Sequence, residues 1–261
     1  MNRFVFFLIL HLLPITLFTA ETITFPSNDG LLITADLYIA HEKAAPFILL
    51  FHQAGFSRGE YLDIAPVLND LGFNAMAIDQ RSGKEVNGII NETARKAWEK
   101  NIRDTYLDAL PDLLAALGYV KEHLAEGKII LWGSSYSASL VLKIAGDFPQ
   151  KVTGILAFSP GEYFERLGES ANFISESARN IKIPVFITSA RKEKNRWWSI
   201  FEIIPSEKKE FFLPSSEGIH GSRALWESTK EHEEYWTAVK KFLQKFHEDN
   251  VLKPPQNLQP Q

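Results

Sequence analysis

The residues best suited to chemistry lie in a short turn between a predicted strand and a predicted helix. The apolar segment 129–132 ends at Gly133, and Ser135 and Ser137 follow before the pattern becomes helical. A sharp strand-to-helix turn lifts a serine hydroxyl out of the backbone, where a base can activate it as a nucleophile. The turn brings the positions two before and two after the nucleophile together, so both must be small. Gly133 and Ser137 meet this condition, and Ser135 is the predicted nucleophile.

The two neighbouring serines fit this role less well. Ser134 would have Trp132 and Tyr136 at the close positions, which are too bulky, and Ser137 should already lie inside the helix. The usual pattern is G-x-S-x-G, and here Ser137 replaces the last glycine. Because Gly/Ser-rich turns after buried strands are common, this motif needs partners elsewhere in the chain.

A serine nucleophile requires a base, and His220 is the predicted one. It stands in a glycine-flanked loop after the last apolar segment, 210–213. His52 follows the segment 47–51 and is expected to shape its own loop through hydrogen bonds. The other five histidines lie in the N-terminal segment, in an early loop or on polar helical stretches: His11, His41, His123, His232 and His247.

The histidine in turn requires a carboxylate, and two candidates follow strands between the serine and the histidine. Glu193 comes shortly after the segment 185–188 and is preferred. Its basic neighbours also allow a simple solvated loop. Glu162, after the segment 152–158, is the second choice.

Backbone donors must stabilise the oxyanion of a tetrahedral intermediate. The N–H of Tyr136 should provide one, because this residue follows the nucleophile at a helix start. Ala54, in the loop 52–55, should provide the other, with Gln53 as the alternative. The side chains of Gln53 and Arg81 are expected to contact the substrate.

The order of segments predicts an α/β fold. Residues 21–40 form a predicted hairpin, and later apolar segments alternate with segments of helical period, as in a parallel sheet covered on both faces. Pro111 is expected to kink or to start its helix. The predicted strands are 47–51, 74–78, 129–132, 152–158, 185–188 and 210–213, and the predicted helices are 61–71, 105–124, 136–147, 195–204 and 229–247.

The composition predicts one globular domain, residues 21–250. The chain has 261 residues, 45% hydrophobic and 23% charged, with a net charge of −4 and no cysteine. Nothing in it indicates a nucleic-acid partner, and a disulfide is excluded. The segment 80–104 is longer than a connection requires, so it predicts a small cap near the site or a solvated surface helix.

The N-terminus resembles a secretory signal peptide, residues 1–20. A short cationic start precedes an almost wholly apolar run from Phe4 to Phe18, and Ala20 offers a small residue for cleavage. Export to a periplasm or to the exterior is expected, and contact with a membrane only if this segment stays uncleaved. The Pro- and Gln-rich end, residues 251–261, is predicted to be disordered.

Together these pieces resemble the α/β-hydrolases, and more narrowly the small serine esterases related to dienelactone hydrolase. The loop 52–55 replaces the family's H-G-x-G, the segment 79–83 is close to its D-x-R-G, and the turn at Ser135 and the loop 218–221 follow in the family's order. The resemblance implies a mostly parallel sheet of about eight strands with helices on both faces. It also implies hydrolysis of an ester, thioester or amide without a metal or cofactor.

Three departures and one difference limit what the resemblance implies. Gln53 and Ser137 stand where the family has glycine, and the acid is a glutamate. Dienelactone hydrolase uses a cysteine, so its substrate is not carried over. The leading hypothesis is a secreted serine hydrolase of a small acyl substrate. A peptidase, an acyltransferase or a non-catalytic binding module are the alternatives, and the oligomeric state is left open.

Overall fold

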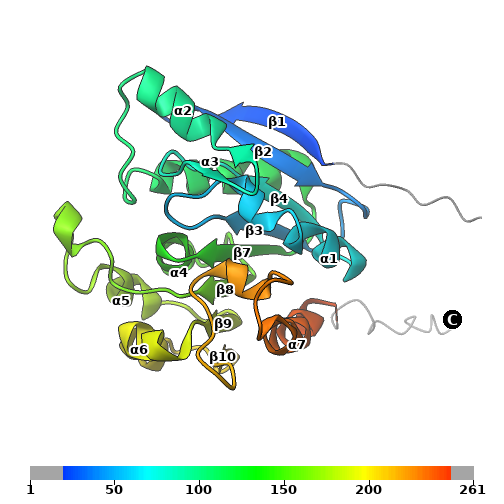
Figure 1. Cartoon of the computed structure of the whole chain (residues 1–261), viewed down its shortest axis with the longest axis vertical. Coiled ribbons are helices and arrows are strands. Elements are labelled where there is room, and N and C mark those ends of the chain that lie inside the picture. Colours follow the sequence, from blue (N-terminus) through cyan, green and yellow to red (C-terminus); the bar gives the residue numbers. More distant parts are fainter. Residues whose placement is uncertain (1–19, 248–261) are drawn as a thin grey trace, which may run out of the picture.

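An eight-stranded, mostly parallel sheet forms the centre of the computed structural model, which describes residues 20–247 (Figure 1). Its strand order is β1-β2-β4-β3-β7-β8-β9-β10. The pairs β1–β2 and β2–β4 are antiparallel and all other pairs are parallel. The strands are β1 (Glu21–Pro26), β2 (Leu32–Tyr38), β3 (Phe47–Phe51), β4 (Asn74–Ile78), β7 (Ile129–Ser134), β8 (Gly154–Phe158), β9 (Val185–Thr188) and β10 (Lys209–Phe212). The predicted fold class and the N-terminal hairpin are confirmed.

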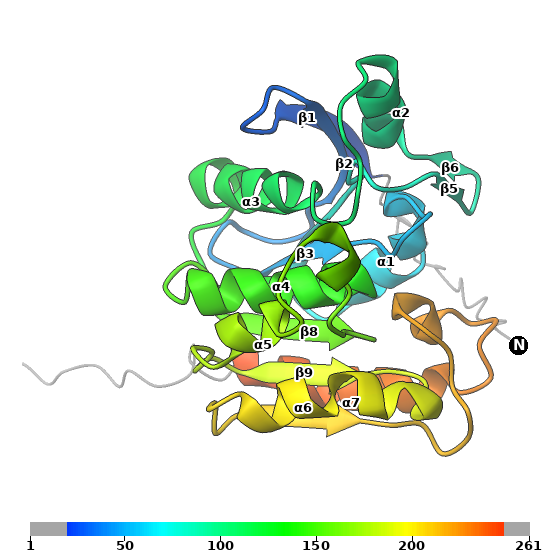
Figure 2. The same cartoon turned by 90° about the vertical axis from the view of Figure 1, so that its left-hand side faces the viewer.

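Helices cover both faces of the sheet, which explains why the central strands are almost wholly apolar and why β3 is apolar at every position. In β3, Phe47, Leu49 and Phe51 pack on one face while Ile48 and Leu50 pack on the other. Four helices lie over the first face, in front of the strands in Figure 2: α3 (Leu110–Tyr119), α4 (Tyr136–Asp147), α5 (Phe173–Ala178) and α6 (Lys194–Ile203). The second face is covered by α1 (Ile64–Asp70) and α7 (His232–Leu243).

The helices differ from the prediction at several places. The segment 61–71 divides into a 3-10 turn, Arg58–Tyr61, and α1. Pro111 lies in the first turn of α3, where its missing N–H has no cost, so it starts this helix rather than kinking it. Helix α5 was not predicted, because its sequence is short and polar.

The segment 80–104 folds into a small hairpin and a helix at the β2 side of the sheet. The hairpin consists of β5 (Glu85–Val86) and β6 (Ile89–Ile90), and α2 (Glu92–Glu99) follows. In α2 only Thr93 and Ala97 are buried. The Thr93 hydroxyl accepts a hydrogen bond from the backbone N–H of Thr34 in β2 at 2.9 Å. This segment is therefore attached to the edge of the fold along one helix face.

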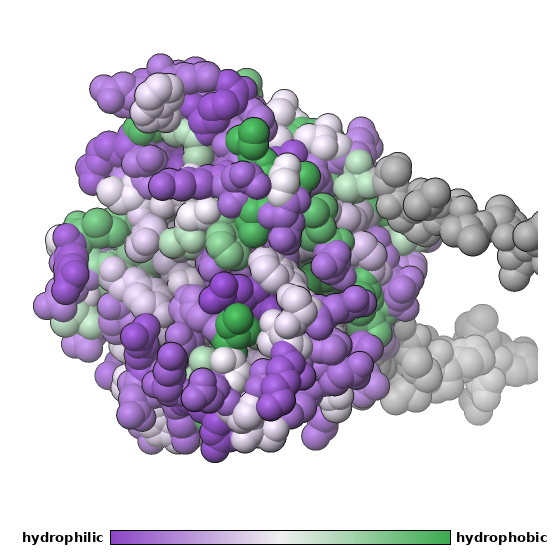
Figure 3. Space-filling view, in the orientation of Figure 1, coloured by the Kyte–Doolittle hydropathy of each residue, from purple (hydrophilic) through white to green (hydrophobic). Residues whose placement is uncertain are grey.

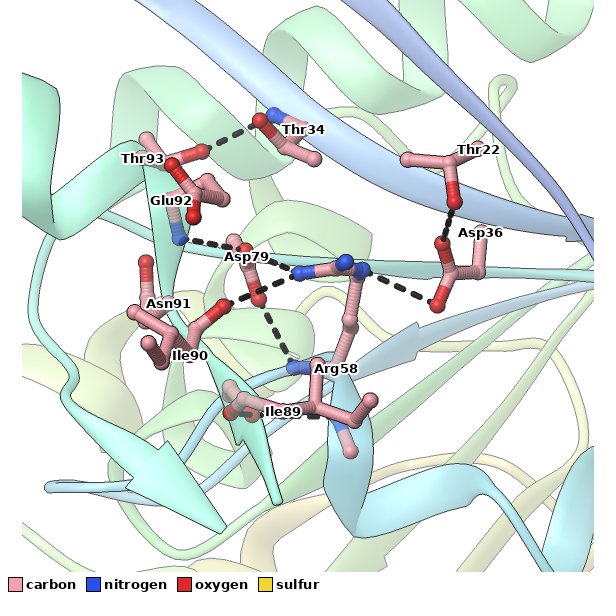
Figure 4. Close-up of polar contacts among 12 residues, drawn as sticks. Thr22, Thr34, Asp36, Arg58, Asp79, Ile89, Ile90, Asn91, Glu92 and Thr93 are labelled. Atoms are coloured by element: carbon pink, nitrogen blue, oxygen red, sulfur yellow. Dashed lines mark hydrogen bonds and ion pairs between the residues drawn. The ribbon is translucent and has the colours of Figure 1, made fainter. Parts of the chain in front are cut away.

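A buried ionic network fixes the same segment (Figure 4). The Arg58 guanidinium pairs with Asp36 of β2 at 2.9 Å and with Asp79 at 2.7 Å, and donates to the backbone oxygen of Ile90 at 3.1 Å. Asp79 also accepts the backbone N–H of Glu92, at the start of α2, at 2.8 Å. Burial raises the pKa of Asp79 to about 6, although Arg58 opposes this. The network joins β2, the end of β4 and the inserted segment.

The outer surface is mainly polar. Hydrophilic residues cover most of the face seen in Figure 3, with apolar residues in small groups between them. Within residues 20–247, no helix has the length and apolar character needed to cross a membrane. The predicted signal peptide, apart from Ala20, and the predicted tail fall outside the described residues.

Candidate active site

Ser135 occupies a strained turn between β7 and α4. Its backbone has φ 59° and ψ −121°, a left-handed conformation that a non-glycine residue adopts only when the surrounding structure imposes it. Its N–H is held by the backbone oxygen of Phe158 in β8 at 2.7 Å. The side chain is half-buried, so it stands at the end of the sheet with access to solvent.

The hydroxyls of the neighbouring serines are bound within the fold. Ser134 ends β7 and donates to Glu60 at 2.7 Å. Ser137 lies inside α4, as predicted, and donates to the backbone oxygen of His52 at 2.7 Å. Both residues are fully buried. Ser135 is thus the serine of this turn whose hydroxyl is open to a reactant.

The close approach that the sequence required is present at Gly133. A Cβ on this residue would lie 2.4 Å from the backbone oxygen of Ser137 and 2.6 Å from the Cα of Ala138. Backbone atoms at these distances cannot move aside without displacing the start of α4.

We expect Gly133→Ala to destabilise the protein by about 3 kcal/mol or more, since an added methyl group would overpack backbone against backbone. Gly118→Ala is the matched control, because Gly118 is exposed in α3 and has no atom within 4 Å of an added Cβ. It should stabilise the helix by about 0.5–1 kcal/mol. Denaturant unfolding of both variants measures the difference, and equal stability of the two would contradict the steric interpretation.

His220 and Glu193 form a hydrogen-bonded pair at the ends of the last two strands. His220 Nδ1 lies 2.8 Å from Glu193 Oε1. Because an ionised carboxylate only accepts, Nδ1 carries the proton and Nε2 is left as the acceptor that a general base needs. His220 is part-exposed, with 28% of its side chain accessible, whereas Glu193 is buried.

Ser159 ties this pair to the end of β8. Its hydroxyl donates to Glu193 Oε2 at 2.8 Å and accepts the N–H of Gly221 at 3.0 Å. Burial alone would raise the pKa of Glu193, but the hydrogen bonds from His220 and Ser159 outweigh it, and this pKa lies below its usual value. Glu193 is therefore ionised at neutral pH, and its oxygens are directed at the histidine and the serine.

The second candidate acid, Glu162, has a different place. Its carboxylate accepts the backbone N–H groups of Ile174 and Ser175 at 2.9 and 2.8 Å. It thereby caps the start of α5. Of the two carboxylates, the structure brings Glu193 to His220 and not Glu162.

The loop 52–55 lies beside the turn of Ser135, and its N–H groups differ in availability. The N–H of Gln53 donates to Glu60 at 2.7 Å. The N–H of Ala54 has no partner within residues 20–247. Tyr136 is the first residue of α4, so its N–H has no partner within the helix and lies at the positive end of the helix dipole. Ala54 and Tyr136 thus offer free donors in this region.

His52 holds the loop 52–55 in place. Its Nε2 accepts the N–H of Gln80 at 3.0 Å, and its Nδ1 donates to the backbone oxygen of Gln53 at 2.8 Å. Burial lowers the pKa of His52 to about 4, so the ring is neutral at physiological pH. The prediction that His52 shapes its loop agrees with these contacts. Gln80 was missed, because a glutamine after a strand carries no motif of its own.

Arg81 does not have the exposure that a substrate contact needs. Its guanidinium is 3% exposed and forms a fork with Asp112, with Nη2 and Oδ1 2.6 Å apart. Its Nη1 pairs with Asp29 in the β1–β2 turn at 2.6 Å. The guanidinium is therefore paired with carboxylates of the fold. Arg81 has a structural role, and the expected contact with the substrate is wrong. Gln53 is also buried, at 8% exposure, with its side chain against Gly221.

Two further aromatic residues lie near the turn. The Tyr163 hydroxyl donates to the backbone oxygen of Ser159 at 2.7 Å and interacts with the side chains of Ser135 and Arg196. Burial raises its pKa to about 12. Tyr106, which is 40% exposed, stacks on Tyr136 with ring centroids 4.7 Å apart. In residues 20–247, no three His, Cys, Asp or Glu side chains are grouped to hold a metal ion.

Several solved structures similar to this chain are hydrolases. An esterase of Pyrococcus furiosus is 17% identical, with 88% of this chain and 93% of that chain covered and a TM-score of 0.66. Dienelactone hydrolase from Anabaena variabilis is 13% identical over 87% and 98%, with a TM-score of 0.68. Acylaminoacyl peptidase of Pyrococcus horikoshii is 14% identical over 92% and 43%, with a TM-score of 0.64. No protein-family model matches the sequence, and the search of curated proteins finds no relative. The chain has the α/β-hydrolase fold.

Proposed function

We propose that this protein is a serine hydrolase that cleaves an ester or a related acyl bond through an acyl-Ser135 intermediate. The observation that carries the proposal is the hydrogen-bonded pair of His220 and Glu193, together with a solvent-accessible serine in a left-handed strand-to-helix turn. The loop of His220 is bonded to this turn through Ser222 and Ser134. The hydrolases that share the fold support the same reaction class. Residues 1–20 have the composition of a signal peptide, so we propose that the enzyme acts after export.

In the proposed mechanism, His220 Nε2 takes the proton of the Ser135 hydroxyl while the serine oxygen attacks the acyl carbon. Glu193 keeps Nδ1 protonated and stabilises the imidazolium that forms. The N–H groups of Ala54 and Tyr136 donate to the oxyanion. His220 then protonates the leaving group. Water, activated by the same nitrogen, releases the acyl group and restores the serine.

The decisive test combines turnover with covalent labelling of residues 21–261. We expect hydrolysis of short p-nitrophenyl esters, and labelling of Ser135 by a fluorophosphonate, located by peptide mass spectrometry. Turnover should fall in proportion to the fraction of the protein that carries the fluorophosphonate label. A folded protein that is neither labelled nor active would refute the proposal and leave a non-catalytic binding module as the explanation.

A peptidase is the second candidate, favoured by the fold similarity to an acylaminoacyl peptidase. An acyltransferase would use the same groups. Product analysis with an N-acyl peptide, and with an added alcohol or amine acceptor, separates these reactions, since only a transferase forms the acylated acceptor in preference to the free acid.

A further inference from the structure

Glu60 is a fully buried carboxylate behind the site, and the proposed mechanism does not use it. It lies in the 3-10 turn Arg58–Tyr61 with no solvent exposure. Its Oε2 accepts the N–H of Gln53 at 2.7 Å, and its Oε1 accepts the hydroxyl of Ser134 at 2.7 Å. Gln53 precedes the free donor Ala54, and Ser134 precedes the nucleophile. The Glu60 carboxylate thus contacts both Gln53, the neighbour of the oxyanion donor, and Ser134, the neighbour of the nucleophile.

The same cluster reaches the loop that carries the histidine. The Ser134 hydroxyl accepts the N–H of Ser222 at 2.8 Å, and the Trp226 indole donates to the backbone oxygen of Glu60 at 2.9 Å. Both residues follow His220 closely in the chain. Three segments therefore meet around Glu60 and Ser134. They are the loop 52–55 (the oxyanion loop), the turn at Ser135 (the serine turn) and the loop 218–226 (the histidine loop).

No cation is paired with Glu60 in the part of the chain that the structure describes. Burial raises the pKa of Glu60 to about 7, although Ser134, Gln53 and Ser222 oppose this. Arg223, after the histidine loop, lowers the pKa through its charge without contact. The phenols of Tyr61 and Tyr136 also interact with the carboxylate. Both protonation states of Glu60 are consequently populated near neutral pH.

Gln53, whose backbone N–H donates to this carboxylate, carries an unpaired acceptor on its side chain. The Gln53 Oε1 atom is buried without a hydrogen bond in residues 20–247. It and the Ser134 hydroxyl lie against the same side of Gly221, at 2.3 and 2.6 Å from where a Cβ would stand. When Glu60 Oε1 takes a proton from solvent, it becomes a donor to Ser134. The Ser134 hydrogen must then point away from Glu60.

We propose that Glu60 is a positioning residue for this reaction, and that its ionised carboxylate aligns the oxyanion loop with the serine turn by accepting from Gln53 and Ser134 together. Protonation reverses the hydrogen bond to Ser134 and weakens the one from Gln53. Ala54 and Ser135 are then no longer held in alignment by one carboxylate. The inference rests on the proposed function. It adds the ionisation of Glu60 to the acid side of the activity profile.

The experiment measures kcat and KM of wild type and Glu60→Gln between pH 5 and 9, with a p-nitrophenyl ester. Glutamine keeps the shape of the side chain and cannot ionise. We expect kcat to fall about 10- to 100-fold at pH 8 with KM changed less than about 2-fold, as for a misaligned oxyanion donor. On the acid side, the logarithm of kcat/KM should fall more steeply with pH in wild type than in Glu60→Gln.

Two further variants keep the inference open to refutation if Glu60→Gln folds poorly. Ser134→Ala removes the shared hydroxyl and leaves the carboxylate, and its loss of kcat should be smaller in the Glu60→Gln background than alone. Asp79→Asn removes another buried carboxylate, which contacts Arg58 and α2. It should lower the thermal midpoint and leave the acid slope as in wild type.

The outcomes separate this inference from the proposed function. If wild type is neither active nor labelled at Ser135, both fail. If wild type is active and labelled, but Glu60→Gln keeps its kcat and its acid slope, the inference about Glu60 alone is overturned. Independent effects of Ser134→Ala and Glu60→Gln would overturn it as well.

Discussion

Ser135→Ala is expected to lower kcat for ester hydrolysis by about 10⁴- to 10⁶-fold and to abolish fluorophosphonate labelling. The hydroxyl oxygen is the atom that forms the acyl bond, and no neighbouring group can replace it, because Ser134 and Ser137 are buried with their hydroxyls engaged. The backbone strain at φ 59° is imposed by the turn and is the same for alanine, so the fold should persist. Steady-state turnover and the labelled fraction measure the effect, and circular dichroism checks the fold.

Ser134→Ala and Ser137→Ala serve as controls for the identity of the nucleophile. Both remove a buried hydrogen bond, so both should lower stability and turnover, but each should still be labelled at Ser135. Labelling of Ser135→Ala at either neighbour would show that the steric argument selected the wrong serine.

Glu193→Gln should lower kcat by about 10³- to 10⁴-fold. Glutamine keeps the size of the side chain but carries no charge to stabilise the imidazolium, and its amide can favour the wrong tautomer of His220. The hydrogen bond from the Ser159 hydroxyl to Glu193 Oε2, which is 2.8 Å long, would be weakened too. KM should change little, because Glu193 is buried and its carboxylate is bonded to His220 and Ser159.

Glu162→Gln is the matched control for the acid. Its carboxylate caps α5, so the variant should lose about 1 kcal/mol of stability or less and keep the wild-type kcat. A large loss of kcat in Glu162→Gln together with a small loss in Glu193→Gln would reverse the assignment.

Sequence reasoning was strongest where one steric or periodic rule decided the answer. The size rule at Gly133 and Ser137 singled out Ser135, and the alternation of apolar and helical segments predicted the parallel sheet. It was weakest where distant residues decide. Glu162 and Glu193 both follow strands, and only the fold shows which one contacts His220.

The roles of Arg81 and Glu60 also depend on distant contacts, although the two residues look different in the sequence. Arg81 follows a strand in a motif-like segment, but its role is set by Asp29 and Asp112, which lie 52 and 31 residues away in the chain. Glu60 belongs to no motif and ends no strand, so no local signal distinguished it from a solvated glutamate. The charge state and burial of both residues depend on contacts that periodicity does not encode.

The links around Glu60 and Ser134 also bear on the order in which the molecule forms. Ser222 contacts Ser134 across 88 residues, and Trp226 contacts Glu60 across 166 residues. Contacts so distant in sequence close the largest loops, so they form late when a chain folds. An emerging polypeptide can therefore build most of its sheet before the histidine loop joins the serine turn. In a newly made chain, catalytic competence would mark the final stage of folding, and unfinished molecules would be inert toward acyl compounds.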